Sequence, residues 1–141
     1  MDILKLEVKG LSKSYDGLKI LDAINFGVKS GEFLSVLGSS GCGKTTLLRI
    51  LIGLLEPDDG KIFLDGQDIT REIPSRRKMG IVFQNYALFG NMTVRQNIEY
   101  AMKFHPALKE KARLTAKELI SLVGLTEHAG KKPAELSGGQ Q

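Results

Sequence analysis

The stretch FLSVLGSSGCGKTTLLRILIGLL, residues 33–55, decides the fold of this chain. It opens on five mostly apolar residues, FLSVL, that predict a short strand. A glycine-rich turn, GSSGCGKTT, follows, and TLLRILIGLL then repeats apolar residues at helical spacing until Pro57. We therefore expect a strand, a loop and a helix in that order, with the helix beginning near Lys44.

The glycine-rich turn fits the pattern G-x-x-x-x-G-K-[ST] through Gly38, Gly43, Lys44 and Thr45, with Gly41 as an additional glycine. Glycines let successive backbone N–H groups turn inward around phosphate oxygens, and the helix N-terminus adds its dipole. In this pattern Lys44 reaches the β- and γ-phosphates, and the Thr45 hydroxyl binds Mg²⁺. The turn therefore predicts a nucleotide site, because a plain helix cap requires no Lys-Thr pair after Gly43.

Cys42 is the only cysteine of the chain and lies inside this turn. A single cysteine excludes an internal disulfide and is typical of proteins in a reducing compartment. Its thiol has two interpretations at this stage: a redox-sensitive group in the loop, or simply a small loop residue.

Composition places the chain among globular domains. It has 141 residues, of which 42% are hydrophobic and 26% charged, and a formal net charge of +4. The longest basic run is residues 76–78 and aromatic residues make up 6%, which disfavours a dedicated nucleic-acid binder. The apolar run 47–55 contains Arg49 and is shorter than the ~20 residues of a spanning helix. With no secretory signal at the N-terminus, we expect a cytoplasmic protein.

Alternating apolar residues predict antiparallel strands around the decisive stretch. Residues 3–33 contain turn signals at Asp16-Gly17 and Ser30-Gly31. The segment KIFLDGQDI is expected to form a hairpin around Asp65-Gly66, and MGIVFQ, residues 79–84, a buried strand.

Two helices are expected in the second half. TVRQNIEYAM, residues 93–102, begins with Thr93 as its cap, and KEKARLTAKELISLVGL, residues 109–125, ends near Gly124. The histidines of this half, His105 and His128, are expected to be surface residues.

Three motifs in order carry a family resemblance. After the glycine-rich turn comes VFQNYALF at 82–89, and LSGGQ at 136–140 follows. This trio resembles the ATP-binding cassette (ABC) family over essentially the whole chain. The resemblance implies an α/β P-loop NTPase of ABC type, 1–141, with missing C-terminal core strands. Residues 1–86 would form an antiparallel β subdomain and a partial RecA-like core, and 87–141 a helical subdomain that ends at the signature motif.

The resemblance also implies residue roles. Tyr15 matches the aromatic residue that stacks on adenine, although a tyrosine here also suits a half-buried turn. Gln84 matches the glutamine that contacts Mg²⁺ and the attacking water and senses the membrane partner. Ser137, Gly138 and Gly139 match the signature that contacts the γ-phosphate of ATP held by the opposite subunit, which implies a head-to-tail dimer.

Together these motifs give the expected site. Lys44 and Gln84 are the expected catalytic residues, and Thr45 and Gln84 the expected Mg²⁺ ligands. The nucleotide-binding residues are expected to be Tyr15, Gly38, Ser39, Ser40, Gly41, Cys42, Gly43, Lys44, Thr45, Thr46, Gln84, Ser137, Gly138, Gly139 and Gln140.

The stretch 76–98 looks most like ATPase subunits of importers for small solutes such as sugars, polyamines, iron or phosphonates. In those relatives the segment after the glutamine cradles a coupling helix of the membrane subunit; YALF, residues 86–89, also suits packing on the helical subdomain. Gly90 stands where such sequences usually carry proline. The implied partners are transmembrane permease subunits, a second ATP-binding subunit and, through the permease, a solute-binding protein, with the chain peripheral on the inner face of the membrane.

In this family the chain continues after LSGGQ with an aspartate for Mg²⁺, a catalytic glutamate and a switch histidine. We therefore expect a shortened ATPase that binds ATP and Mg²⁺ weakly and does not turn over. Residues 33–37 would have unpaired edges and an uncovered apolar face, which invites strand exchange or aggregation. Two alternatives stay open: a soluble ABC ATPase of DNA repair or translation, and a non-hydrolysing nucleotide-binding module.

Overall fold

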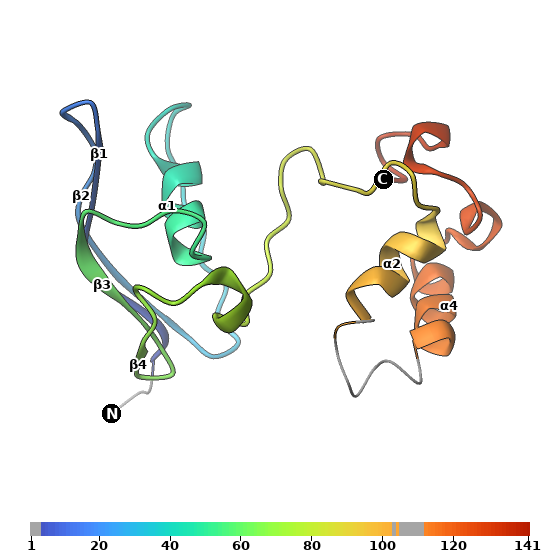
Figure 1. The fold of residues 1–141 in the computed structure, drawn as a ribbon, viewed down its shortest axis with the longest axis horizontal. Coiled ribbons are helices and arrows are strands. Elements are labelled where there is room, and N and C mark those ends of the chain that lie inside the picture. The colour runs from blue at the N-terminus through green and yellow to red at the C-terminus, as the bar shows by residue number, and fades with distance from the viewer. Residues whose placement is uncertain (1–3, 103, 105–111) are drawn as a thin grey trace. The chain divides into compact units, whose positions relative to one another are not determined.

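The computed structural model describes residues 4–102, 104 and 112–141, and its elements are labelled in Figure 1. The chain divides into two units, residues 1–81 and residues 82–141, and each is described by itself. The predicted boundary after residue 86, between the β subdomain with its P-loop core and the helical subdomain, stays a prediction.

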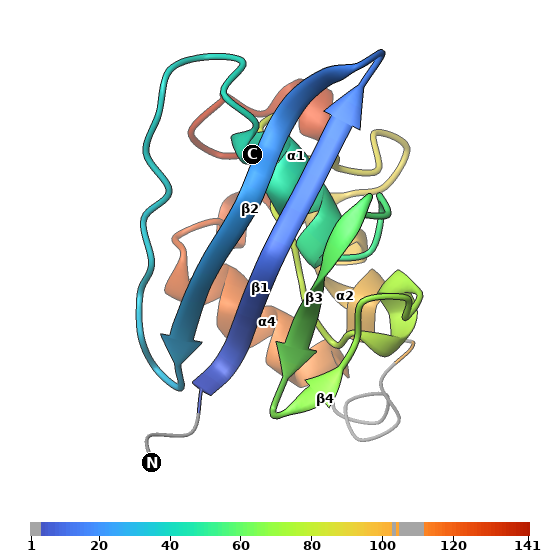
Figure 2. The same ribbon diagram turned by 90° about the vertical axis from the view of Figure 1, so that its left-hand side faces the viewer.

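An antiparallel sheet of four strands, in the order β2-β1-β3-β4, forms one side of the first unit (Figure 2). Its strands are β1 (Leu4–Tyr15), β2 (Leu18–Lys29), β3 (Asp59–Leu64) and β4 (Gln67–Asp68). The predicted antiparallel strands and the predicted hairpin around residues 65–66 are both confirmed.

Both hairpins turn through two residues in the left-handed region. Asp16 and Gly17 have φ of 49° and 80°, and Asp65 and Gly66 have φ of 51° and 77°. Two-residue turns of this kind match the right-handed twist of the strands they join. The short Asp-Gly signals therefore fix both hairpins locally.

Helix α1 (Lys44–Leu51) packs on this sheet, as Figure 2 shows. The helix begins at Lys44 as predicted. It ends well before Pro57, because Gly53 takes φ 81° and the N–H groups of Gly53 and Leu54 donate to the carbonyls of Ile50 and Arg49. A short 3-10 helix, η1 (Pro74–Arg76), follows the sheet. The buried core consists of Val8, Leu11, Leu21, Leu47, Ile50, Leu51, Ile62 and Ile69.

Two predicted strands are absent from the described residues. Residues 33–37 and 79–84 both lie outside any strand, so these two predictions were wrong. Phe33 is 90% exposed and Leu37 89%, and Val82 is 83% exposed rather than buried. The uncovered strand face expected at residues 33–37 stays a prediction. A strand needs backbone hydrogen bonds to a neighbour, and no described strand pairs with either segment.

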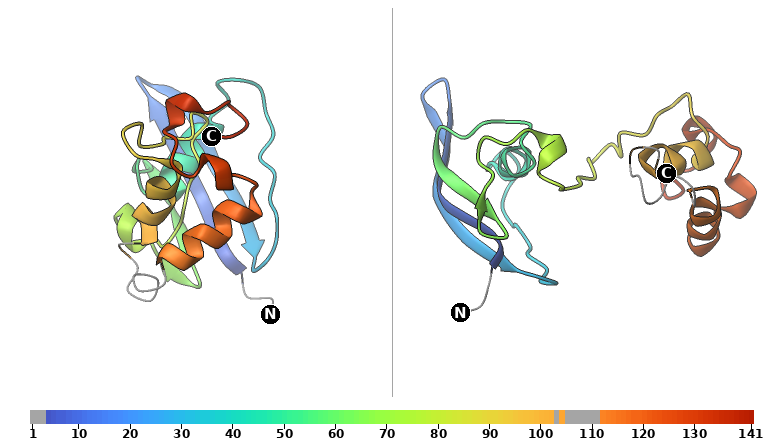
Figure 3. Two further views of the ribbon diagram at one scale, coloured as in Figure 1. Left: turned by 90° about the vertical axis from the view of Figure 1, so that its right-hand side faces the viewer. Right: turned by 60° about the horizontal axis from the view of Figure 1, so that its bottom comes forward.

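The second unit is helical. Helices α2 (Val94–Met102) and α4 (Ala112–Leu122) lie side by side in Figure 3. Two short 3-10 helices, η2 (Thr126–His128) and η3 (Pro133–Glu135), follow them. The small core consists of Val94, Ile120 and Ala129, with Ile98, Leu125 and Leu136 packed against it. No helix in the described part of the chain is long and apolar enough to cross a bilayer.

The predicted ends of these helices are confirmed where they are described. The Thr93 hydroxyl accepts a hydrogen bond from the Gln96 N–H, and the Gln96 side-chain oxygen accepts one from the Thr93 N–H, which is a capping box. Gly124, with φ 71°, follows the end of α4. The predicted start of that helix at residue 109 lies outside the described residues.

Candidate functional site

The glycine-rich loop runs directly into the N-terminus of α1. Gly43 precedes the helix with φ 95° and ψ 1°, a left-handed conformation that L side chains rarely adopt. A Cβ at Gly43 would lie 2.9 Å from Ile20 Cγ2 and 3.1 Å from the Ile20 carbonyl oxygen. The loop is thus pressed against β2, and only glycine fits at this point without strain.

Lys44 folds back over this loop. Its Nζ donates hydrogen bonds to the carbonyl oxygens of Gly38 at 2.7 Å and Ser39 at 2.6 Å, and it lies 3.5 Å from Cys42 Sγ. The first N–H groups of α1 have no partner within the helix and carry the positive end of its dipole. An ammonium group, free amides and a helix dipole therefore converge on one loop, which is the chemistry of a phosphate site.

The exposed Cys42 thiol also packs against the backbone of the loop. A Cβ at Gly38 would collide with the Cys42 sulfur, so the small side chain at 42 and the glycine at 38 fit one another. This contact explains a small residue at Cys42 without any redox role.

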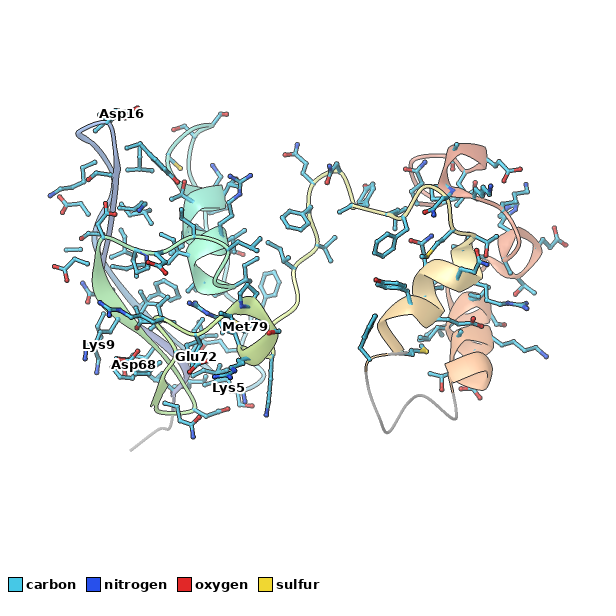
Figure 4. The ribbon with its side chains drawn as sticks, in the orientation of Figure 1. Lys5, Lys9, Asp16, Asp68, Glu72 and Met79 are labelled. Atoms are coloured by element: carbon cyan, nitrogen blue, oxygen red, sulfur yellow. The ribbon has the colours of Figure 1, made fainter. Side chains whose placement is uncertain are left out.

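Tyr15 ends β1, next to the hairpin tip that carries Asp16 in Figure 4. The hairpin tip and the N-terminus of α1 lie at the same end of the first unit, as Figures 1 and 2 agree. Tyr15 is 43% exposed, and the Lys13 Nζ lies 5.9 Å from its ring centroid. The predicted adenine-stacking residue is thus accessible at the end of the unit that carries the phosphate loop.

Both carboxylate oxygens of Asp58 form hydrogen bonds with β1. Its Oδ1 accepts from Lys13 Nζ at 2.6 Å, and its Oδ2 accepts from the Ser14 N–H at 2.7 Å. The hydrogen bond from Lys13, followed by the one from Ser14, lowers the pKa of the Asp58 carboxyl below its ordinary value, because both favour the charged form. Sequence reasoning missed this cluster, since its members are far apart in the chain.

Gln84 lies in the second unit, in an exposed turn. Tyr86 and Ala87 follow with φ of 57° and 50°, a left-handed pair that is uncommon outside glycine. Of the YALF residues, Phe89 packs against Tyr100 of α2, with 4.5 Å between ring centroids and the rings tilted by 53°, and yet stays partly exposed. It thus packs on the helical unit, and part of its surface stays exposed.

The SGGQ turn, residues 137–140, closes on itself. The Gln140 N–H donates to the Ser137 carbonyl at 2.9 Å, and the Ser137 N–H donates to the Gln140 side-chain oxygen at 3.0 Å. Gln141 adds a hydrogen bond from Nε2 to the Pro133 carbonyl at 2.8 Å. Ser137 and the two glycines are exposed at the surface.

His128 supports this turn and is half-buried, so the expectation of a surface histidine was wrong; His105 lies outside the described residues. The Gln140 Nε2 lies 3.1 Å from His128 Nε2. Because the Gln140 oxygen accepts from the Ser137 N–H, its NH₂ group faces His128 Nε2. The other ring nitrogen, Nδ1, is buried and has no partner among the described residues.

The expected site residues are divided between the two units. Tyr15 and the loop from Gly38 to Thr46 belong to the first unit, whereas Gln84 and residues 137–140 belong to the second. Among the residues the structure describes, no three His, Cys, Asp or Glu side chains group as a metal site. The roles of Thr45 and Gln84 toward Mg²⁺ stay predictions.

Comparison with known proteins now decides the family. The family described as ABC transporter matches residues 21–141. This chain belongs to the ABC transporter family. Its α/β fold of P-loop, ABC type is confirmed by a solved relative, the dimeric structure of a post-hydrolysis state of an ATP-binding cassette bound to ADP and Pi. That relative has a TM-score of 0.81 and 31% identity, and the match covers 96% of this chain and 64% of the solved one.

Curated ABC relatives are more similar in sequence. A spermidine/putrescine import ATP-binding protein of Marinobacter nauticus is 45% identical over 96% of this chain and 36% of its own length. Its counterpart in Thermotoga maritima is 42% identical over 97% of this chain and 37% of its own. A putrescine transport ATP-binding protein of Escherichia coli is 43% identical over 96% and 36%. The chain thus spans little more than a third of the length of these relatives.

Proposed function

We propose that the chain is the nucleotide-binding part of an ATP-binding subunit of an ABC importer. Such a subunit couples ATP binding and hydrolysis to solute movement through separate membrane subunits. The observation that carries the proposal is the Lys44 ammonium, held 2.7 Å and 2.6 Å from two loop carbonyls at the head of α1. Gly43, which is left-handed and packs closely against β2, leads from that loop into α1.

Each residue has a distinct role in this proposal. The loop amides and Lys44 bind the phosphates and offset their charge, and Tyr15 stacks on the base. The Thr45 hydroxyl and the Gln84 side chain would hold Mg²⁺, and Gln84 would orient water. Bound ATP supplies the phosphoryl group, and Mg²⁺ supplies further positive charge at its oxygens.

The proposed partners follow from the family. The signature residues Ser137 to Gly139, exposed in the structure, suit contact with ATP held by a second ATP-binding subunit, and the solved relative is described as dimeric. The exposed parts of Tyr86, Leu88 and Phe89 suit a permease subunit, with the chain peripheral on the inner membrane face. The names of the curated relatives favour a polyamine such as spermidine or putrescine as the solute.

For the 141-residue chain alone, we propose weak nucleotide binding with negligible turnover. The test is titration of MgATP into the chain by calorimetry, with phosphate release assayed in parallel. Lys44→Ala should weaken ATP binding by about 10- to 100-fold, because it removes charge-assisted hydrogen bonds worth ~1.5–3 kcal/mol.

The matched control is Arg49→Ala, which removes the same charge from an exposed position on the same helix. It should leave ATP affinity within about twofold, as expected for an exposed charge that makes no contact with the ligand. The proposal is wrong if the wild-type chain takes up no ATP at millimolar concentration, or if both variants weaken binding equally.

A further inference from the structure

The end of β1 carries a charge cluster that the proposed function does not use. The Lys13 side chain is only 15% exposed, although it is charged, and it forms an ion pair with Asp58 at 2.6 Å. The Asp58 N–H donates in turn to the Ser12 carbonyl at 2.9 Å. The backbone and the side chain of Asp58 thus form hydrogen bonds with Ser12, Lys13 and Ser14 of β1, immediately before Tyr15.

These hydrogen bonds lie at the point where the pairing of β1 with β2 is irregular. Lys13 pairs with Leu21, but Ser14 pairs with Lys19 and Tyr15 with Leu18, so the register shifts between Lys13 and Ser14. Such an irregularity kinks a strand and re-aims the side chains that follow it. The Ser14 N–H donates to Asp58 Oδ2 at 2.7 Å. Asp58 therefore anchors the strand at the point where its direction changes.

Lys13 also acts on the tyrosine ring itself. Its Nζ lies over the Tyr15 ring, 5.9 Å from the centroid, within the range of a cation–π contact. The same ammonium is held by Asp58, so the ring is placed against a fixed charge rather than a mobile one. Tyr15 is 43% exposed and thus accessible to a ligand.

We infer that Lys13 and Asp58 are positioning residues that hold the Tyr15 ring for a purine base. This inference rests on the proposed function, because it assigns the Tyr15 ring to the base of the bound nucleotide. A ring fixed in advance loses less conformational freedom when a base stacks on it. The pair therefore strengthens recognition of the base and has no part in holding the phosphates, which belong to the loop at Lys44.

The test compares two ligands, MgATP and inorganic tripolyphosphate with magnesium, on the complete chain. Lys13→Met should weaken ATP binding by about 3- to 10-fold, the range expected from loss of one pre-ordered side chain. Tripolyphosphate, which has no base, should bind as before. Lys13→Arg should retain most of the ATP affinity, because arginine also pairs with a carboxylate and lies over an aromatic ring.

Lys19→Met is the matched control. Lys19 pairs with Ser14 across the β1–β2 ladder and forms an exposed ion pair with Asp22 at 2.8 Å. Its replacement by methionine therefore removes the same charge from the same end of the sheet. Asp58→Ala, measured beside it, should reproduce the loss of ATP affinity seen in Lys13→Met. Circular dichroism spectra of all variants should match the wild type.

Three results would overturn the inference. Equal weakening of both ligands by Lys13→Met, beyond the effect of Lys19→Met, would mean a general loss of charge or fold. Unchanged ATP affinity in Lys13→Met and Asp58→Ala would mean that the pair does not position the ring. Failure of the wild type to bind either ligand would overturn the proposed function together with this inference, which separates that case from the other two.

Discussion

The phosphate loop, residues 38–45, and the signature turn, residues 137–140, both contain glycines but are built in opposite ways. In the phosphate loop, Gly43 is left-handed and packed so closely on β2 that a Cβ would meet the Ile20 side chain and backbone. In the signature turn, Gly138 and Gly139 lie outside the left-handed region, and no described atom lies within 4 Å of where a Cβ would be. The fold itself demands the first glycine. It does not demand the other two, so any requirement for them must come from what approaches the turn.

The contacts that support the two loops differ as well. The phosphate loop leads into α1, and Arg77 forms hydrogen bonds with the C-terminal end of α1. Arg77 is 2% exposed. Its guanidinium donates to the carbonyls of Ile50 at 2.8 Å and Leu51 at 2.9 Å, and further to those of Thr70 and Glu72. A cation at this end of a helix also complements the dipole. The signature turn instead relies on side-chain amides at the surface.

The largest expected effect tests the contacts of Arg77 that support α1 and, through it, the phosphate loop. Arg77→Ala should lower the free energy of unfolding of the first unit by about 3–5 kcal/mol, because it removes the hydrogen bonds of a buried guanidinium to four backbone carbonyls. Urea titration followed by circular dichroism measures this. Arg76→Ala is the control: its side chain is 73% exposed and lies 3.8 Å from Glu72, so it should cost less than about 1 kcal/mol. Equal costs for the two arginines would contradict the anchoring role of Arg77.

The next effect separates the two kinds of glycine directly. Gly43→Ala should lower the free energy of unfolding by about 1–3 kcal/mol, because the new Cβ is strained and meets Ile20. Gly138→Ala should stay within about 0.5 kcal/mol of the wild type, as expected for an unpacked surface position. Thermal unfolding of both variants by circular dichroism gives the comparison. Similar losses in the two would show that the signature turn is also constrained by the fold.

Local signals in the sequence predicted much of this arrangement. The Asp-Gly pairs at 16–17 and 65–66 specify tight turns through neighbouring residues alone, and both hairpins form there. Thr93 and Gln96 likewise cap α2 within four residues. The strand predicted at 33–37 failed because an apolar run indicates burial but not which segment will pair with it.

Longer-range contacts explain what sequence reasoning missed. Arg77 belongs to a basic run that is typical of a solvated surface, yet it is buried against helix α1, far away in the chain. The ion pair of Lys13 with Asp58 also joins distant segments. His128 was expected at the surface, because a lone histidine gives no sign of a partner such as Gln140. In each case tertiary packing determines which residue is the partner, and the spacing of residues along the sequence does not reveal it.

The smallest expected effect concerns the support of the signature turn. His128→Ala removes the acceptor of the Gln140 NH₂ group, so the Gln140 oxygen is held less firmly against the Ser137 N–H. A neutral hydrogen bond contributes ~0.5–1.5 kcal/mol, so hydrogen exchange at the Ser137 amide should quicken by about 2- to 10-fold. Glu127→Ala, an exposed neighbour in η2, should leave that rate unchanged. Nitrogen-15 NMR should place the His128 ring proton on Nδ1, because Nε2 faces the Gln140 NH₂ group, and a proton on Nε2 instead would mean that Gln140 presents its oxygen to the ring.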